Sequence, residues 1–434
     1  MKLWDKGYTA NNLVDKFTVG KDRELDLKLA KYDVLGNIAH AKMLHKIAVF
    51  SDKEIEDVLT ALNEIKEEVA SGNFTIEEQF EDVHSKIEFE LVQKIGETGK
   101  KIHTARSRND QVLVDLHLYA KDEINEIKGL VKNLFHTLIQ LSDKYKEVII
   151  PGYTHLQVAM PSSFGLWFGA YAETLIDDVA FLNSAYQIVD QNPLGSAAGY
   201  GTSFNIDRDL TTELLGFKIM KFNVVAAQMS RGKLEKSTAL ALSSVAGTLS
   251  KMASDICLYM CQNFNFLGFP KELTTGSSIM PHKQNPDVFE LVRAKANKIQ
   301  SLVTELIMLT NNLTSGYHRD FQLLKESFMN AIDETKNILE VSNFMMQHIE
   351  IIPDIIEDKM YDYMYSVENL NHLVNNGATF REAYQIMGKE ILEGKFEPFK
   401  EVNHIHKGSI GNLCLDEIVG KFEETYLHFN LKVS

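Results

Sequence analysis

Proline is nearly absent from long parts of this chain, and its distribution limits the possible folds more than any other feature. The 434 residues contain eight prolines, and the first of them is Pro151. A proline inside a helix removes a backbone hydrogen bond and clashes with the preceding turn. The proline-free stretches 194–269 and 287–352 are therefore compatible with unusually long helices.

A helical repeat of apolar side chains follows Arg231. Large apolar residues recur there at steps of three or four positions: Leu242, Val245, Leu249, Met252, Ile256 and Met260. Small residues lie between them and let neighbouring helices approach closely. The pattern predicts a helix from about Lys233 to Asn263, roughly 45 Å long at 1.5 Å per residue. A similar pattern predicts a helix over 287–311.

The fold class follows from these helical patterns, because no alternating strand pattern of convincing length occurs. We expect a mainly α protein with a central bundle of long helices. The predicted division has three parts: 1–110 as an N-terminal helical domain, 111–357 as the central long-helix bundle domain, and 358–434 as a small C-terminal helical domain. These boundaries carry a tolerance of about ten residues.

Composition excludes several classes of function. The formal net charge of -15 argues against nucleic acid as a partner, because no basic stripe offsets it. No run of about 18 uncharged apolar residues predicts a membrane span. The first ten residues lack the apolar core of a signal peptide. The three cysteines, Cys257, Cys261 and Cys414, fit neither a disulfide framework nor a zinc site, so a reducing cytoplasm is the simplest compartment.

Four short polar segments interrupt the helical stretches, and the first two contain arginine and histidine. His103–Gln111 holds two arginines, an amide and hydroxyls, a composition suited to binding carboxylates. The alternative is a solvated loop at a helix start, with Asp110 near the cap. Gly152–Gln157 places His155 after a Pro-Gly turn, where it suits general acid–base chemistry. The alternative for a lone histidine is a structural role.

The third segment, Thr274–Asp287, is a Thr/Gly/Ser loop that leads into a helix, with Asn285 as the expected N-cap and Pro286 at its first position. Free N–H groups at such a helix end favour anions, and Lys283 adds a full positive charge. Ser277 lies on the part of the loop where a lid residue would lie. The alternative is an ordinary helix cap with an exposed serine loop.

The fourth segment runs from Tyr317 to Lys325. Gln322 and Lys325 are three positions apart and face the same way on a helix. Together with Tyr317 they suit the second polar end of a ligand, and the alternative is a polar helix surface. Glu290 falls in the first turns of the helix after the third segment, where it is placed to orient a histidine.

These segments carry a resemblance to a known family. The third contains GSSIMPHKQNP, which resembles the GSSxMPxKxNP signature of the fumarase/aspartase superfamily. Within that superfamily, four other segments resemble those of the argininosuccinate lyases: Arg106–Gln111, Gly152–Gln157, Tyr317–Lys325 and Phe380–Tyr384. The resemblance extends from about Lys16 to Gly388, nearly the whole chain.

The resemblance implies a three-domain fold and a homotetramer whose active sites each take residues from three subunits. It also implies the reversible β-elimination of argininosuccinate to L-arginine and fumarate, with no cofactor and no metal. On the family pattern Ser277, on a mobile loop, is the base and His155 is the general acid. Lys283 stabilises the intermediate together with Asn285, and Glu290 pairs with the histidine. Substrate contacts fall on Ser107, Arg108, Asn109, Thr154, Tyr317, Gln322 and Lys325.

Two departures from the family pattern leave questions open. Many members have glycine where Ala105 stands. The run 17–23 is longer by two residues than the family's, so the N-terminal substrate contact near Gly20 stays unassigned. Which of Ser277 and His155 takes the first proton also stays open.

Two alternative functions need to be weighed against this one. The shared loop alone does not separate argininosuccinate lyases from fumarases, aspartases and adenylosuccinate lyases, but the segments around Asn109 and Gln322 favour argininosuccinate. A non-catalytic helical scaffold is the second alternative, since relatives of these lyases serve as lens proteins. That alternative predicts the loss of His155, Ser277 or Lys283, and all three are present.

Overall fold

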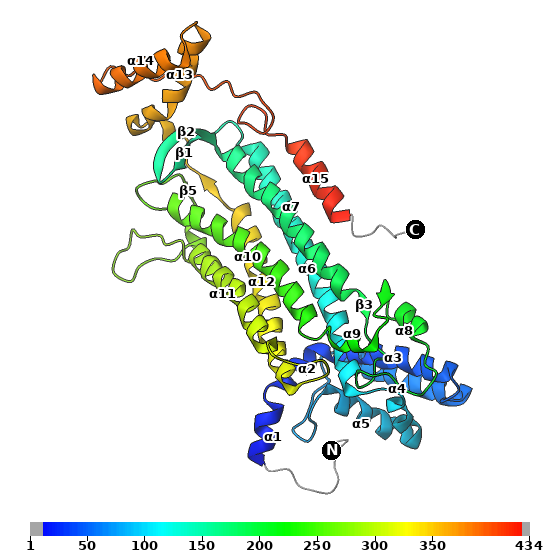
Figure 1. The fold of residues 1–434 in the computed structure, drawn as a ribbon. Coiled ribbons are helices and arrows are strands. Elements are labelled where there is room, and N and C mark those ends of the chain that lie inside the picture. Colours follow the sequence, from blue (N-terminus) through cyan, green and yellow to red (C-terminus); the bar gives the residue numbers. More distant parts are fainter. Residues whose placement is uncertain (1–11, 428–434) are drawn as a thin grey trace. The chain divides into compact units, whose positions relative to one another are not determined.

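The computed structural model describes residues 12–427. The outermost residues of the two predicted terminal domains lie outside this range, as do the first ten residues, in which we expect no signal peptide. The α-helices are α1 (Asn12–Val19), α2 (Asp22–Asp26), α3 (Ala30–Lys46), α4 (Asp52–Ala70), α5 (Val83–Ile95), α6 (Arg108–Lys144), α7 (Phe164–Val189), α8 (Arg208–Leu214), α9 (Val224–Gln228), α10 (Lys233–Tyr259), α11 (Asp287–Thr310), α12 (Leu324–Gln347), α13 (Ser366–Asn375), α14 (Phe380–Leu392) and α15 (Leu415–Leu427) (Figure 1). The strands are β1 (Ile149–Thr154), β2 (Gln157–Ser163), β3 (Gln191–Asn192), β4 (Ile219–Met220), β5 (Leu267–Gly268) and β6 (Glu350–Ile351).

The chain forms two compact units, each built from three segments. Unit 1 comprises the described residues of Met1–Lys128, Phe181–Ser244 and Lys298–Thr335, and unit 2 those of Gly129–Ala180, Val245–Asn297 and Lys336–Ser434. The helices α6, α7, α10, α11 and α12 each contribute residues to both units. The predicted division into three domains stays a prediction.

Long helices dominate the fold, as the proline distribution predicts. α6 has 37 residues, and α7, α10, α11 and α12 have 26, 27, 24 and 24. α6 is therefore about 55 Å long at 1.5 Å per residue. α10 begins at Lys233 as predicted but ends at Tyr259 instead of Asn263, because the chain turns back there. The N–H of Phe266 then donates to the carbonyl oxygen of Tyr259 at 2.9 Å.

The apolar repeat predicted on α10 is buried. Leu242, Val245, Leu249, Met252 and Ile256 all belong to the core. In unit 2, side-chain hydrogen bonds join the neighbouring helices: Thr137 of α6 donates to Asn343 of α12 at 2.7 Å, and Trp167 of α7 donates to Asp255 of α10 at 3.1 Å. The predicted bundle of long helices is confirmed.

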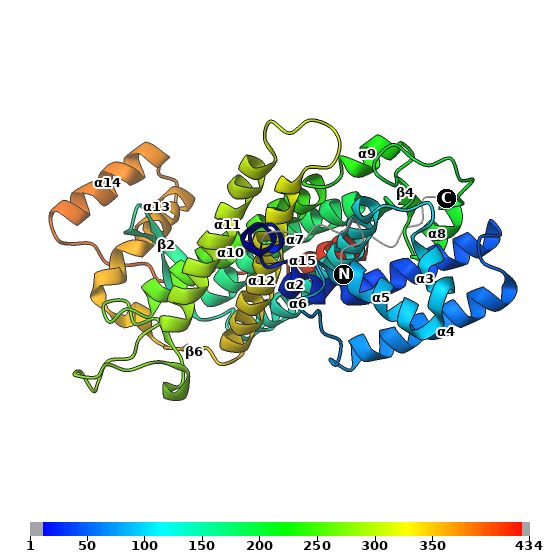
Figure 2. The same ribbon diagram turned by 90° about the horizontal axis from the view of Figure 1, so that it is seen from below.

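In unit 1, the helices α3, α4 and α5 lie side by side (Figure 2) around a separate apolar core. Val34, Leu44, Leu62, Ile65 and Leu91 are fully buried there. α4 is well delimited at its start, since Ser51 and Glu54 form a reciprocal capping box. This core supports the N-terminus of α5, where Asp82 and His84 lie.

A β-hairpin of β1 and β2 is the main difference from the predicted fold. The strands are antiparallel, and their register shifts between Pro151 and Tyr153. A Cβ atom on Gly152 would lie 2.9 Å from the carbonyl oxygen of Met160, so the close approach of the strands requires glycine there. The sequence gives little indication of these strands, because proline has no N–H to donate and is unusual inside a strand. Here Pro151 pairs with Pro161.

The hairpin turns in only two residues, His155 and Leu156. Both have left-handed backbone conformations, with φ values of 54° and 61°. This matches a type I′ turn, which usually carries Asn-Gly because other side chains are strained at positive φ. The usual turn signal is therefore missing from the sequence, and the hairpin was not predicted.

Smaller elements complete the fold. β3 pairs with β4 in parallel, and β5 pairs with β6 in antiparallel orientation. α13 and α14 pack against each other around Leu370, Ala383 and Met387, and Thr379 caps α14. No helix among residues 12–427 combines the length and the hydropathy that crossing a bilayer requires.

The buried side chain of His117 on α6 makes stability depend on pH. Its Nδ1 lies 2.7 Å from the carbonyl oxygen of Val189, its Nε2 lies 3.1 Å from Oγ of Ser230, and burial lowers the pKa of the imidazole to about 3. In the unfolded chain this pKa is about 6.5. The unfolded state therefore takes up a proton first, and the stability contributed by His117 is lost as pH falls from 6.5 towards 3.

We expect the free energy of unfolding to fall below pH 6.5 by about 1.4 kcal/mol per pH unit from this residue. His117→Asn keeps a donor for the Val189 carbonyl but does not titrate, so it removes that part of the slope. Urea unfolding of both proteins between pH 7.5 and 4.5 measures the difference. Equal slopes would contradict the assignment.

Candidate active site

A polar pocket of about 240 Å³ lies in unit 1. Five of the predicted substrate contacts line it: Arg108, Asn109, Tyr317, Gln322 and Lys325. Eight further residues of its lining were not predicted: Asp22, Asp26, Glu81, Asp82, His84, Val112, Arg231 and Arg319. The charged groups of both signs make the pocket suitable for a ligand that is itself a zwitterion.

Lys325 is a buried residue of the pocket lining. Its Nζ is 2.7 Å from a carboxylate oxygen of Asp22 and 2.7 Å from one of Asp26, and the lysine is almost fully buried. Burial acts to lower the pKa of Lys325, but the two carboxylates outweigh it and the pKa is raised. The lysine is therefore a fixed cation, held in place by α2.

Gln322 and Arg319 tie the N-terminal segment to the pocket wall. Nε2 of Gln322 donates to the carbonyl oxygens of Thr18 and Val19 at 2.8 and 3.0 Å. A guanidinium nitrogen of Arg319 donates to the same Thr18 oxygen at 2.7 Å and to Glu81 at 3.1 Å. The backbone at the end of α1, just before Gly20, is therefore hydrogen-bonded to residues of the pocket lining.

The N-terminus of α6 presents Arg108 and Asn109 to the pocket. Ser107 is the N-cap: its Oγ accepts the N–H of Asn109 at 3.2 Å, and Asp110 accepts the N–H of Ser107 at 2.9 Å. This reciprocal arrangement fixes the first turn. Arg108 is oriented in addition by Asp82, at 3.0 Å.

Asp110 links the start of α6 to a second loop. Its other carboxylate oxygen accepts the N–H groups of Gly195 and Ala197 at 3.0 and 2.9 Å. Burial raises the pKa of Asp110 to about 6 against the lowering effect of these donors. Asp110 does lie near the cap of α6, but it is buried and does not belong to a solvated loop. Ser107 is absent from the pocket lining, so its substrate contact stays a prediction.

Arg231 is a pocket residue that no sequence motif indicated. Its Nε donates to Glu235 at 2.9 Å, and a terminal nitrogen donates to the carbonyl oxygen of Phe321 at 3.0 Å. Arg231 and Glu235 are both buried. An arginine and a glutamate four positions apart at a helix start are too common to indicate a site in the sequence. Only the fold brings Arg231 beside the 317–325 segment.

The remaining predicted residues belong to unit 2, and the hairpin tip holds two of them. Thr154 ends β1 and His155 occupies the first position of the turn, where both are exposed to solvent. His155 has a left-handed backbone conformation at the tip of a short hairpin. A strained backbone of this kind is common at functional sites.

The loop with the signature motif is closed at its base by a bridge between Thr275 and Asn285. The N–H of Asn285 donates to the carbonyl oxygen of Thr275 at 2.9 Å. Within the loop, Oγ of Ser277 accepts the N–H groups of Ile279 and Met280 at 3.3 and 3.1 Å. Lys283 is exposed on the same loop.

α11 starts at Asp287, as the apolar pattern predicts, but its N-cap lies one residue later than expected. The carbonyl oxygen of Pro286 accepts the N–H of Glu290 at 3.0 Å, so Pro286 and not Asn285 is the N-cap. The side chain of Asn285 instead reaches back to the carbonyl oxygen of Gly276 at 3.4 Å. Glu290 lies in the first turn of α11, as predicted, and no hydrogen bond within residues 12–427 joins it to His155.

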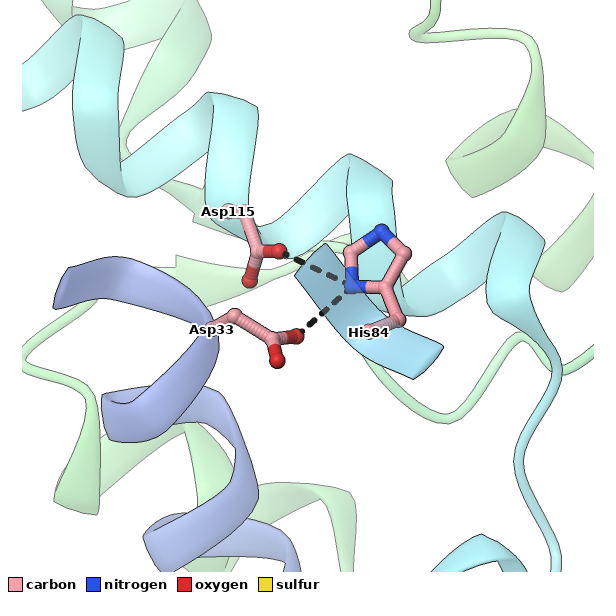
Figure 3. A group of neighbouring side chains, drawn as sticks. All are labelled: Asp33, His84 and Asp115. Carbon is pink, nitrogen blue, oxygen red and sulfur yellow. Dashed lines mark hydrogen bonds and ion pairs between the residues drawn. The ribbon is translucent and has the colours of Figure 1, made fainter. Parts of the chain in front are cut away.

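The described residues contain one group with the geometry of a metal site. Asp33, His84 and Asp115 bring three possible ligand atoms within 4.8 Å of one another (Figure 3). All three side chains are buried, and His84 also lines the pocket. Their spacing along the sequence gives no metal motif, so this group was not predicted.

Comparison with known proteins agrees with the fold and the motifs. A family model described as "Lyase" matches residues 6–301. Argininosuccinate lyase of Phocaeicola vulgatus is 54% identical over 432 residues, which cover 100% of this chain and 97% of that protein. Argininosuccinate lyase of Bacteroides fragilis is 52% identical over 431 residues, which cover 99% and 96%.

Solved structures agree as well. A crystal structure of EDDS lyase in complex with formate matches with a TM-score of 0.79 over 98% of this chain and 92% of that one. Its sequence identity is 19%, so this similarity concerns the fold alone. The long-helix fold, the signature loop and the identity over the full length together show that the chain belongs to the argininosuccinate lyase family of the fumarase/aspartase superfamily.

Proposed function

We infer that this chain catalyses the reversible β-elimination of argininosuccinate to L-arginine and fumarate, a step of arginine biosynthesis. The observation that carries this function is identity of 52–54% over nearly the full length to argininosuccinate lyases. Ser277, His155 and Lys283 are all present, as an active enzyme requires.

The pocket in unit 1 is suited to the amino-acid ends of this substrate. Asn109, Tyr317, Gln322 and Lys325 supply donors and a fixed cation, and the pocket's carboxylates can face an ammonium or a guanidinium group. Arg108 supplies a second cation beside Asn109. We assign two further predicted contacts, Ser107 and Thr154, to the substrate on the family pattern alone.

The chemical step removes a proton from the carbon next to a carboxylate and builds a doubly charged aci-carboxylate. Such a charge needs fixed cations and N–H donors where it develops. Lys283, Asn285 and the N-terminus of α11 supply them. A serine hydroxyl is a poor base, but the two N–H groups that Oγ of Ser277 accepts, from Ile279 and Met280, would stabilise its ionised form.

The second half of the reaction breaks the carbon–nitrogen bond. The electron pair left on carbon forms the double bond of fumarate, and the leaving guanidino nitrogen takes up a proton. We propose that His155 supplies this proton, directly or through a water molecule. Glu290 is proposed to pair with His155 and hold the imidazole in position.

We propose that the enzyme is a homotetramer whose active sites are shared between subunits. Several large apolar side chains on the long helices remain exposed in one chain, among them Leu240 (49%), Leu258 (37%), Leu291 (59%) and Met308 (66%). Side chains of this size on bundle helices are typical of faces that other subunits cover. The three free cysteines agree with the reducing cytoplasm that we propose as its compartment.

The ultraviolet absorbance of fumarate tests the proposed function directly. The purified protein is given argininosuccinate, malate, aspartate and adenylosuccinate in parallel. We expect fumarate from argininosuccinate alone. A faster reaction with another substrate would assign a different member of the superfamily, and no reaction with any of them would favour the scaffold alternative.

A further inference from the structure

His84 is a pocket residue with an unusual set of partners. It lies in the first turn of α5, and only 5% of its surface is exposed. Its Nδ1 is 2.8 Å from a carboxylate oxygen of Asp33 on α3 and 3.7 Å from one of Asp115 on α6. Both interactions end on the same ring nitrogen, and the other nitrogen is turned away from the two carboxylates (Figure 3).

The partners of Asp33 show which atom carries the hydrogen between Asp33 and His84. The Asp33 carboxylate accepts hydrogen bonds from Gln111 at 2.7 Å and from Asn37 at 3.0 Å. A carboxylate surrounded by donors is ionised, so Nδ1 of His84 donates to it. Burial acts to lower the pKa of His84, but the charge and hydrogen bond of Asp33 outweigh it, and the pKa is raised.

Asp115 differs from Asp33 in its surroundings. Neither of its side-chain oxygens has a hydrogen-bond partner among residues 12–427, and the side chain is fully buried. Burial, followed by the nearby charge of Asp33, raises the pKa of Asp115 well above its usual value. The donors around Asp33 favour its ionised form, burial favours the protonated form of Asp115, and the Asp33 carboxylate favours the imidazolium form of His84.

The other cations of the pocket are held by protein carboxylates. Lys325 lies between Asp22 and Asp26, and Arg231 is paired with Glu235. His84 is held through Nδ1, and within residues 12–427 no hydrogen bond involves its Nε2, which lies on the side of the ring away from the carboxylates (Figure 3). An imidazolium N–H in a buried pocket is a strong donor for a carboxylate.

We propose that His84 is a further substrate-binding residue, which donates its Nε2–H to the α-carboxylate at the arginine end of the ligand, and that Asp33 and Asp115 are positioning residues behind it. This proposal rests on the proposed function, because it takes the pocket to hold the arginine half of argininosuccinate. The arginine end is chosen because Tyr317, Gln322 and Lys325 of the same pocket are assigned to the amino-acid ends.

A metal ion is the competing explanation of the three side chains. Against it stands Arg106, whose guanidinium is buried beside the group and acts electrostatically on both Asp33 and Asp115. A metal on Nδ1 would have to replace the proton of His84 and would be repelled by Arg106. The 2.8 Å distance from Nδ1 of His84 to Asp33, and the donors around Asp33, fit a protonated histidine.

Calorimetric titration of the full-length enzyme with two ligands tests the proposal. L-arginine carries the α-carboxylate, and agmatine is the same molecule without it. In His84→Asn, the asparagine amide can still donate to Asp33, while the distal donor is lost. We expect arginine to bind about 10- to 100-fold more weakly to this variant and agmatine to bind within twofold of its wild-type affinity.

His45→Asn is the matched control, since His45 pairs with Asp52 on the surface and is absent from the pocket lining. It should leave both affinities unchanged. If His84→Asn does not fold, His84→Gln is judged by the same comparison of arginine with agmatine. Equal weakening of both ligands, or no weakening of either, would overturn the proposal.

Two further measurements separate this proposal from a metal site and from the proposed function. A fall in melting temperature on chelation that zinc reverses would overturn it in favour of a metal. Fumarate formation by the wild-type enzyme is measured independently. If that activity is missing while the discrimination between arginine and agmatine depends on His84, the proposed function fails and the binding assignment stands.

Discussion

Ser277→Ala is expected to lower the rate of fumarate formation by about 10²–10⁴-fold, the usual effect of removing an acid–base catalyst. The substitution removes the oxygen that accepts the N–H groups of Ile279 and Met280 and that would take the substrate proton. The rate is measured from fumarate absorbance at saturating argininosuccinate. Turnover within tenfold of the wild type would exclude Ser277 as the base.

The neighbouring serine provides the control. Ser278 lies on the same loop, is exposed, and accepts no hydrogen bond within residues 12–427. Ser278→Ala also removes one hydroxyl oxygen from the loop, but we expect it to keep at least a third of the wild-type activity. Both variants should elute at the size of the wild type, because neither side chain belongs to the core.

His155→Asn is expected to lower turnover by a comparable factor, about 10²–10⁴-fold. Asparagine is among the residues that best tolerate the left-handed conformation seen at position 155 (φ 54°), so the hairpin turn should persist. The variant therefore removes the imidazole without changing the backbone. Turnover is measured from fumarate absorbance at saturating argininosuccinate, and a rate within tenfold of the wild type would exclude His155 as the acid.

Leu156→Asn is the matched control for the hairpin. It places the same tolerant residue at the second left-handed position, φ 61°, and leaves His155 intact. We expect it to keep most of the activity. If Leu156→Asn is as inactive as His155→Asn, the loss reflects the hairpin's shape and not the imidazole.

The helical part of the fold was predictable because its signals are local. The start of α10 at Lys233, its buried seam from Leu242 to Ile256, and the extent of α11 all follow from proline positions and apolar periodicity. The hairpin was missed because its turn at His155 lacks the residues that mark such turns.

The pocket was predictable only in part, for a related reason. Arg108, Asn109, Tyr317, Gln322 and Lys325 stand in motifs and were all found at the pocket. The other lining residues depend on contacts between distant parts of the chain, such as the pairing of Lys325 with Asp22 and Asp26. A single sequence contains no periodic signal for such contacts.

The two-residue turn at His155 and Leu156 also has a consequence for any attempt to raise the thermal stability of this enzyme. Two left-handed positions without glycine cost about 1–2 kcal/mol each, and replacing them by Asn and Gly would relieve that cost. The same replacement would delete the proposed acid. At this turn, selection for thermal robustness and selection for catalysis act in opposite directions.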